Sequence, residues 1–158
     1  MNDLASRPNH LPWPPILYVS AIALAILAHL AWALPWFMPP LSDILFAVGW
    51  LLVVAVVFID VSAMRSLAKA RTTIMPNRGA DHLVTTGPFS FSRNPIYLAN
   101  TLLMIGVGLI AGIAWFIVFA VIAAFATQKL AIEREERHLE QRFGKRYRDY
   151  ARKVRRWI

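Results

Sequence analysis

The sequence predicts an all-α integral membrane protein: about four transmembrane helices, the last two a tight hairpin, followed by a cytoplasmic amphipathic C-terminal helix. Two observations predict this class. Of the 158 residues, 58% are hydrophobic although the net charge is +8, and the apolar and basic residues alternate in separate runs, as in membrane proteins. The length favours a single domain. The chain has no cysteine, which excludes disulfides, thiolate metal sites and cysteine nucleophiles.

Three apolar stretches define the spans. The first two have the roughly 20 residues that cross a bilayer, and the Pro/Trp cluster after the first is a poor signal-peptide cleavage site. The third stretch, residues 96–130, is too long for one span, because such a helix would cover about 52 Å. Gly106, Gly108 and Gly112 indicate a break within it, and Asp43 is expected to cap the second span. The predicted spans are residues 16–34, 44–63, 96–110 and 113–130.

The placement of charge predicts the topology. The middle loop, residues 64–95, is basic, and the chain from Gln128 onward carries eleven of the seventeen Lys and Arg residues. The positive-inside rule places the N-terminus, this loop and the C-terminal segment 131–158 in the cytoplasm. Four spans put all three on one side, whereas three spans would not. Because topology explains the basic excess, we expect the membrane bilayer as a partner and no nucleic acid.

The junction "SRNPIYL" links the middle loop to the third span. Pro95 suits the first turn of a helix, and Asn94 then falls at the N-cap, where Asn is favoured. In the structural interpretation this is a capped membrane helix with a snorkelling Arg93. A functional interpretation is open as well, because loops as long as the middle one often carry function.

Four glutamates lie within eight residues of the otherwise basic C-terminal segment, at the predicted membrane boundary: Glu133, Glu135, Glu136 and Glu140. Leu139, Phe143, Tyr147 and Tyr150 form an apolar stripe, which predicts an amphipathic helix against the membrane face. Gly144 is expected to end or bend it. The glutamates are either a solvated face or a site for a cationic ligand.

Other polar and small residues have simpler explanations. His29 and Asp60 lie within predicted spans, where ionisable groups are functional candidates, although a lone His is more often hydrogen-bonded between helices. Gly106 and Gly108 indicate close helix packing or the approach of a ligand. No spacing of His and carboxylate residues predicts a metal site.

Two segments together resemble the isoprenylcysteine carboxyl methyltransferase and phospholipid methyltransferase superfamily, in its bacterial-type membrane form. One is "LVTTGPFSFSRNPIYL". The other contains the paired Glu135 and Glu136 and continues to "FGKRYRDY". The resemblance covers residues 72–158 and implies a membrane enzyme that uses S-adenosylmethionine, with an unidentified lipophilic or lipid acceptor. From the resemblance together with the placement of charge, we expect a bacterial inner membrane with both termini cytoplasmic. The sequence also lacks the βαβ pattern and Gly-rich loop of soluble Rossmann enzymes.

The resemblance also implies a set of site residues. Lys129 lies where eukaryotic relatives place a substrate-binding arginine, and Tyr97, Glu136 and Lys129 are the implied catalytic residues. Gly106 and Gly108 match a Gly-x-Gly of the phospholipid branch. The implied cofactor-binding residues are Asp81, His82, Leu83, Val84, Phe89, Arg93, Asn94, Pro95, Ile96, Tyr97, Gly106, Gly108, Glu133, Glu135 and Glu136; none is a metal ligand.

The expected chemistry is direct methyl transfer in line from a sulfonium, for which positioning and desolvation suffice. A carboxylate or thiolate acceptor needs no general base, whereas an amine must lose a proton, with Tyr97, His138 or a glutamate as candidates. Many relatives have His where this chain has Asn94, which cannot titrate near neutrality, so we expect a positioning role there. Two alternatives remain: an NADPH-dependent reductase of the sterol reductase type, and a non-catalytic four-helix protein or transporter.

Overall fold

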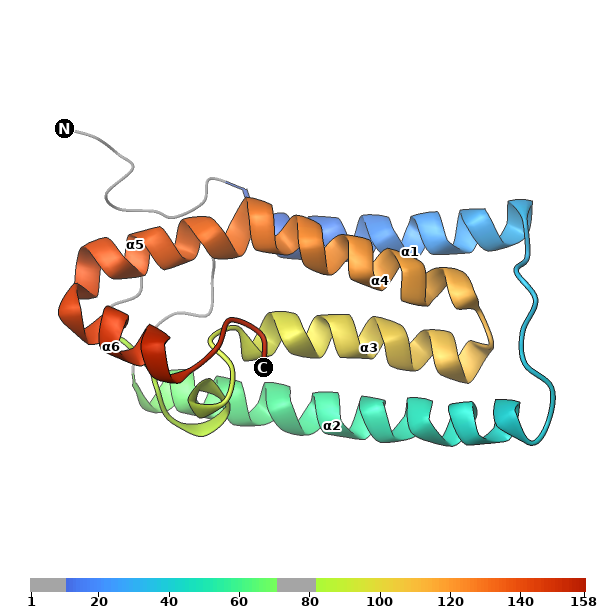
Figure 1. Ribbon diagram of the computed structural model, residues 1–158, viewed down its shortest axis with the longest axis horizontal. Coiled ribbons are helices and arrows are strands. Elements are labelled where there is room, and N and C mark those ends of the chain that lie inside the picture. Colours follow the sequence, from blue (N-terminus) through green and yellow to red (C-terminus); the bar gives the residue numbers. More distant parts are fainter. Residues whose placement is uncertain (1–10, 71–81) are drawn as a thin grey trace.

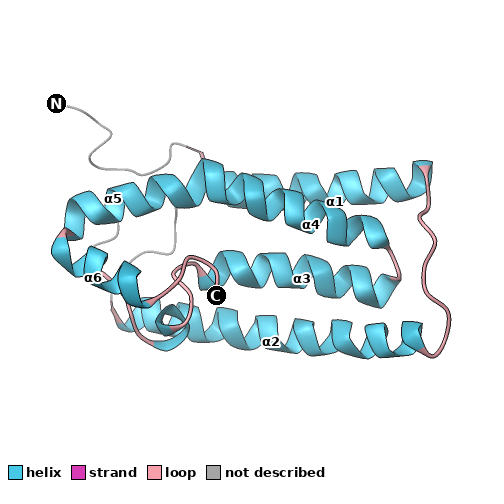
Figure 2. Ribbon diagram, viewed as in Figure 1, coloured by secondary structure: helices cyan, strands magenta, loops and turns pink. Residues whose placement is uncertain are grey.

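The computed structural model describes residues 11–70 and 82–158, and the regular structure in those residues is helical throughout (Figure 2). Four helices lie side by side as a bundle, and two shorter ones form a cap at one end (Figure 1). The predicted all-α class is therefore confirmed. The bundle consists of α1 (Trp13–Ala31), α2 (Leu41–Lys69), α3 (Pro95–Ala111) and α4 (Ala114–Thr127), and the cap of α5 (Glu133–Phe143) and α6 (Lys145–Lys153).

The bundle has the dimensions and surface of a membrane protein. Three helical stretches are long and apolar enough to cross a membrane, namely α1, α2 and the continuous run Ala114–Phe143. Helix α3 has 17 residues, or about 25 Å, slightly less than the ~30 Å hydrocarbon core. Only 11% of the most apolar window of α2 is buried. Such a large apolar surface needs lipid around it, so this is an integral membrane protein.

Small residues let the helices approach closely. Helix α3 packs between α2 and α4, and α4 packs in turn against α1. A Cβ added at Gly49 would lie 2.8 Å from the backbone oxygen of Gly106, and one added at Gly108 would lie 2.7 Å from Cβ of Phe116. Ala25 and Ala120 are fully buried in the core shared by α1, α3 and α4. Close backbone approach at such residues is how membrane helices associate.

The predicted hairpin between the last two spans turns at Gly112, which ends α3 with a φ of +69°. Glycine adopts this left-handed conformation without strain. Ile113 donates its backbone N–H to the oxygen of Gly108 at 2.9 Å, and α4 follows. The helix does not break at Gly106 or Gly108, contrary to the prediction, because both lie inside α3.

Several boundaries differ from the predicted ones. Helix α1 begins and ends three residues earlier, with prolines in its first turn. Helix α2 continues through the first six residues of the expected loop. Asp43 is not its N-cap, because Pro40 holds that position and Asp43 lies in the first turn, where its charge still favours the helix dipole.

The C-terminal segment is divided more finely than predicted. Helix α4 continues through η3 (Gln128–Ile132), a π-helical segment, directly into α5. Gly144 has a φ of +53° and separates α5 from α6, so the predicted break there is confirmed. After Lys153 the chain is no longer helical, and it returns toward the start of α3 (Figure 1). The cap, the 3-10 turn η2 (Gly87–Ser90) and the C-terminus thus gather at one end of the bundle, here named the polar end.

Candidate functional site

The start of α3 provides the first part of the site. Asn94 is the N-cap and Pro95 the first helical residue, as predicted, but the Asn94 side chain does not cap the helix. Its Nδ2 instead donates to the backbone oxygen of Arg156 at 3.0 Å. Ser92 is fully buried and its Oγ accepts from the backbone N–H of Asn94 at 3.1 Å. Asn94 therefore holds the C-terminal segment in place, and its expected role in positioning the cofactor stays a prediction.

Residues 154–158, the C-terminal tail, form the second part. The backbone N–H of Arg93 donates to the oxygen of Arg155 at 3.0 Å. The indole Nε1 of Trp157 donates to Oε1 of Gln128 in the π segment at 2.8 Å. Because these bonds tie the tail to both α3 and η3, its side chains are held over the α5 glutamates. No sequence argument assigned a role to Arg156 or Trp157; the basic, aromatic ending of the chain was the available signal.

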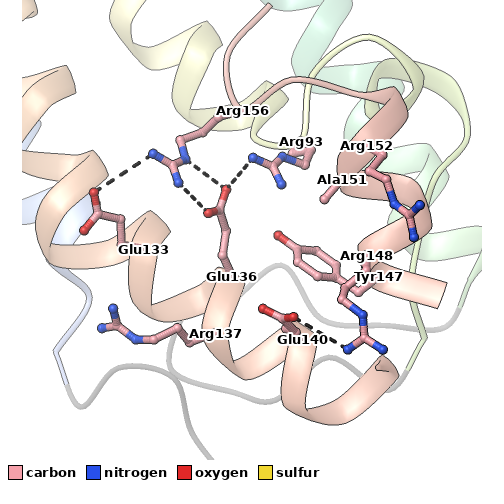
Figure 3. Close-up of a pocket in the computed structure, with 10 residues that line it drawn as sticks. All are labelled: Arg93, Glu133, Glu136, Arg137, Glu140, Tyr147, Arg148, Ala151, Arg152 and Arg156. Carbon is pink, nitrogen blue, oxygen red and sulfur yellow. Dashed lines mark hydrogen bonds and ion pairs between the residues drawn. The ribbon is translucent and has the colours of Figure 1, made fainter. Parts of the chain in front are cut away.

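Glu136 lies at the centre of the charged network (Figure 3). Arg156 binds it in a bidentate manner, with Nε to Oε1 at 3.0 Å and Nη2 to Oε2 at 2.7 Å. Nη2 of Arg93 lies 3.1 Å from Oε1. The carboxylate is only 16% exposed, and its hydrogen bond raises the pKa of Arg156 further. Fork-to-fork pairs of this kind are strong and directional.

Glu133 is the more accessible glutamate of this network. Its Oε1 accepts from Nζ of Lys129 at 2.7 Å and lies 4.0 Å from Nη1 of Arg156. The hydrogen bond to Lys129 lowers the pKa of the Glu133 carboxyl. Lys129 lies in the π segment, where the bundle meets the cap, and such segments are frequent at functional sites. The structure thus places three predicted residues, Lys129, Glu133 and Glu136, along one connected network.

A pocket of about 560 Å³ opens beside this network. Its volume lies within the ~300–1,000 Å³ typical of small-molecule sites. Five arginines and three glutamates line it, so its charged side chains carry a formal excess of two positive charges. The pocket therefore accommodates both signs of charge and favours an anionic group. Its lining residues, drawn in Figure 3, are Arg93, Glu133, Glu136, Arg137, Glu140, Tyr147, Arg148, Ala151, Arg152 and Arg156.

Glu135 points away from this network although it is next to Glu136 in the sequence. It accepts a hydrogen bond at 2.7 Å from the hydroxyl of Tyr97 in the first turn of α3. Burial raises the pKa of the Glu135 carboxyl to about 7, with a further contribution from Glu136, while the tyrosine bond opposes the shift. The two adjacent glutamates therefore have different partners: Glu136 is paired with two positively charged arginines, whereas Glu135 is bound by an uncharged tyrosine hydroxyl.

The remaining predicted residues lie outside the pocket lining. Phe89 belongs to η2, and its backbone oxygen accepts from the hydroxyl of Tyr150 at 2.6 Å. Ile96 lies in the first turn of α3. Gly106 and Gly108 lie deep in α3 and pack against α2 and α4, which supports the packing interpretation; their cofactor role stays a prediction. His82, Leu83 and Val84 precede η2, and Asp81 lies outside the described residues.

Comparisons with known proteins identify the family of this chain. The family model of the phospholipid methyltransferases matches residues 44–146, which include the start of α3 and the α5 glutamates. The nickel-cobalt-cadmium resistance protein NccN of Alcaligenes xylosoxydans xylosoxydans is 32% identical over 144 residues, which are 90% of this chain and 60% of that protein. This chain thus covers less than two thirds of that relative's length. No solved structure matches it. The chain belongs to the phospholipid methyltransferase family.

Proposed function

We propose that the protein is an S-adenosylmethionine-dependent methyltransferase that acts on a lipophilic or amphipathic acceptor: a carboxylate, a thiol or an amine. The observation that carries the proposal is the meeting of the start of α3, the glutamates of α5 and the C-terminal tail around one pocket. This pocket lies at the end of a membrane bundle in a chain of a methyltransferase family. When bound, the cofactor supplies an electrophilic methyl group on a sulfonium.

The residues present suit such a cofactor. Its methionine part carries a carboxylate and an ammonium, and its ribose carries two hydroxyls. Arg93 lines the pocket and has a buried Nε without a hydrogen-bond partner among the described residues, so it can donate to a carboxylate. Glu133 and Glu140 line the same pocket and can accept from an ammonium or from ribose hydroxyls. Glu136 is paired with two arginines and holds them in position.

Catalysis in this proposal is positioning rather than covalent chemistry. The bidentate Arg156–Glu136 pair and the tail bonds fix the walls of the pocket, and fixed geometry lowers the entropic part of the barrier. Lys129 has a half-exposed side chain at the junction of bundle and cap, where it can orient the polar group of a membrane-borne acceptor. For an amine acceptor, the glutamates that line the pocket are the candidates for taking the proton, because Tyr97 and Glu135 lie outside its lining.

Binding experiments test the cofactor. Purified protein in detergent should bind S-adenosylhomocysteine in a calorimeter. Glu136→Ala should weaken that binding by at least tenfold, because it releases Arg93 and Arg156 from their fixed positions. Asp43→Ala is the matched control, since it removes an acidic residue from the first turn of α2 and should leave the affinity unchanged. Tight NADPH binding without any response to S-adenosylhomocysteine would favour a reductase and reject the proposal.

We further propose that the polar end faces the cytoplasm of a bacterial cell, because it carries most of the basic residues. A reporter fused after Ile158 should then be active in the cytoplasm, and one inserted near Pro39 should be active outside. The reverse pattern would reject this orientation.

A further inference from the structure

Tyr147 carries a hydroxyl that the fold does not use. The residue is 4% exposed, and its hydroxyl has no hydrogen-bond partner among the described residues. Figure 3 shows it on the pocket wall with the hydroxyl pointing toward the Glu136 side. A buried hydroxyl without a partner destabilises a fold, because it has lost its hydrogen bonds to water.

Tyr150, three residues later on α6, is a buried tyrosine whose hydroxyl does have a hydrogen-bond partner. It is similarly buried, at 9% exposed, but its hydroxyl donates to the backbone oxygen of Phe89 at 2.6 Å. The two rings contact each other edge to face, with their centroids 6.3 Å apart, as is usual for aromatic pairs. Since packing alone requires only the ring, the Tyr147 hydroxyl is available for a ligand.

The surroundings of this hydroxyl define the ligand group. Burial and the nearby Glu136 raise the pKa of Tyr147 to about 12, so the hydroxyl keeps its proton and can act as a donor. The Nε of Arg93, on the same wall, is a second buried donor without a partner. Two hydrogen-bond donors without partners, in a pocket with more arginines than glutamates, suit a ligand group that is negatively charged and accepts hydrogen bonds. The carboxylate of an amino acid moiety is such a group.

We propose that the Tyr147 hydroxyl and Arg93 Nε together bind the carboxylate of the cofactor's methionine part. This inference rests on the proposed function and assigns Tyr147 as a ligand-binding residue. Arg93 is already oriented by Glu136 and by the tail, and Tyr147 is oriented by its ring contact with Tyr150. Both donor atoms are covered by protein in this structure, so the side chains over them have to shift when the ligand binds.

The test compares S-adenosylmethionine with its decarboxylated form, which lacks only the carboxylate, in calorimetric titrations of the wild type and Tyr147→Phe. The substitution should weaken binding of S-adenosylmethionine by about tenfold and change the affinity for the decarboxylated form by less than about twofold. Tyr150→Phe is the matched control and should leave the preference between the two ligands intact. Equal weakening of both ligands, or no weakening of either, would overturn the inference. Failure of the wild type to bind either ligand would reject the proposed function, and the inference with it.

Thermal unfolding without ligand gives an independent readout. Tyr147→Phe removes an unpaired buried hydroxyl and should leave Tm unchanged or raise it, whereas Tyr150→Phe breaks a hydrogen bond and should lower Tm. A fall in Tm for Tyr147→Phe as large as that for Tyr150→Phe would show that the Tyr147 hydroxyl is structural, and would also overturn the inference.

Discussion

The spanning bundle and the polar end are held together by different forces. In the bundle, α2, α3 and α4 meet at glycines, and α1 packs on α4 through alanines, so the size of a side chain decides what fits. At the polar end, α3, α5 and the C-terminal tail are joined by hydrogen bonds and ion pairs centred on Glu136. Substitutions in the bundle should therefore change the stability of the protein through side-chain volume, and substitutions at the polar end should change it through charge.

The largest effect is expected at Glu136. Replacing it with Gln leaves Arg93 and Arg156 facing a neutral amide, and breaking a buried pair costs about 3 kcal/mol. Chemical or thermal unfolding in detergent should show this loss at neutral pH. An unchanged stability would mean that the network does not hold the polar end together.

Replacing the adjacent Glu135 should raise the stability of the protein, whereas replacing Glu136 should lower it. Its folded-state pKa of about 7 lies above the ordinary value of 4.5, so ionisation between these pH values destabilises the folded protein. Glu135→Gln keeps an acceptor for Tyr97 without the charge. It should match the stability of the wild type below pH 4.5 and exceed it by about 3 kcal/mol at pH 8. Unfolding measured across this pH range checks the sign; lower stability than the wild type at pH 8 would contradict it.

In the bundle, Gly49→Ala should destabilise by about 1–2 kcal/mol. The added methyl would meet the Gly106 oxygen and the Ile110 side chain, each at 2.8 Å, and the two helices would have to move apart. Ala55→Val is the control, because Ala55 is exposed on the same helix and additional volume there meets only lipid. Equal effects from the two substitutions would show that α2 and α3 do not pack closely.

The smallest effect is expected for Arg156→Gln, about 1 kcal/mol, because Glu136 keeps Arg93 as a partner and Arg156 is 31% exposed. Arg155→Gln is a close control, because the substitution keeps the backbone oxygen of Arg155 that accepts from Arg93. The loss for Arg156→Gln should also shrink at high salt, as screening weakens exposed charge pairs. A loss that does not depend on salt would assign Arg156 a packing role.

Local signals in the sequence predicted the bundle and some of the residues of the candidate site. The lengths of the apolar runs, Gly112 and Gly144 gave the helices and their breaks, because span length and positive φ are local properties. The junction at Asn94 and Pro95 and the glutamates at Glu133 and Glu136 were found in the same way and resembled a family motif.

What could not be predicted depends on contacts between distant segments. Arg156 and Glu136 are 20 residues apart, and nothing in either local sequence shows that the tail folds back to neutralise the glutamate. Glu135 and Glu136 point toward different partners because different faces of α5 meet α3 and the C-terminal tail. The π segment at Gln128 shifts this helical phase, and no residue pattern indicates it.

The central claim is that the polar end is a cofactor pocket, and amide hydrogen exchange with and without S-adenosylmethionine tests it most directly. Exchange should slow in peptides from residues 92–98 and 133–157, which carry the pocket. It should not change in residues 32–41 and 111–114, the connections at the opposite end of the bundle. Unchanged exchange throughout, or slowing confined to the opposite end, would contradict the account.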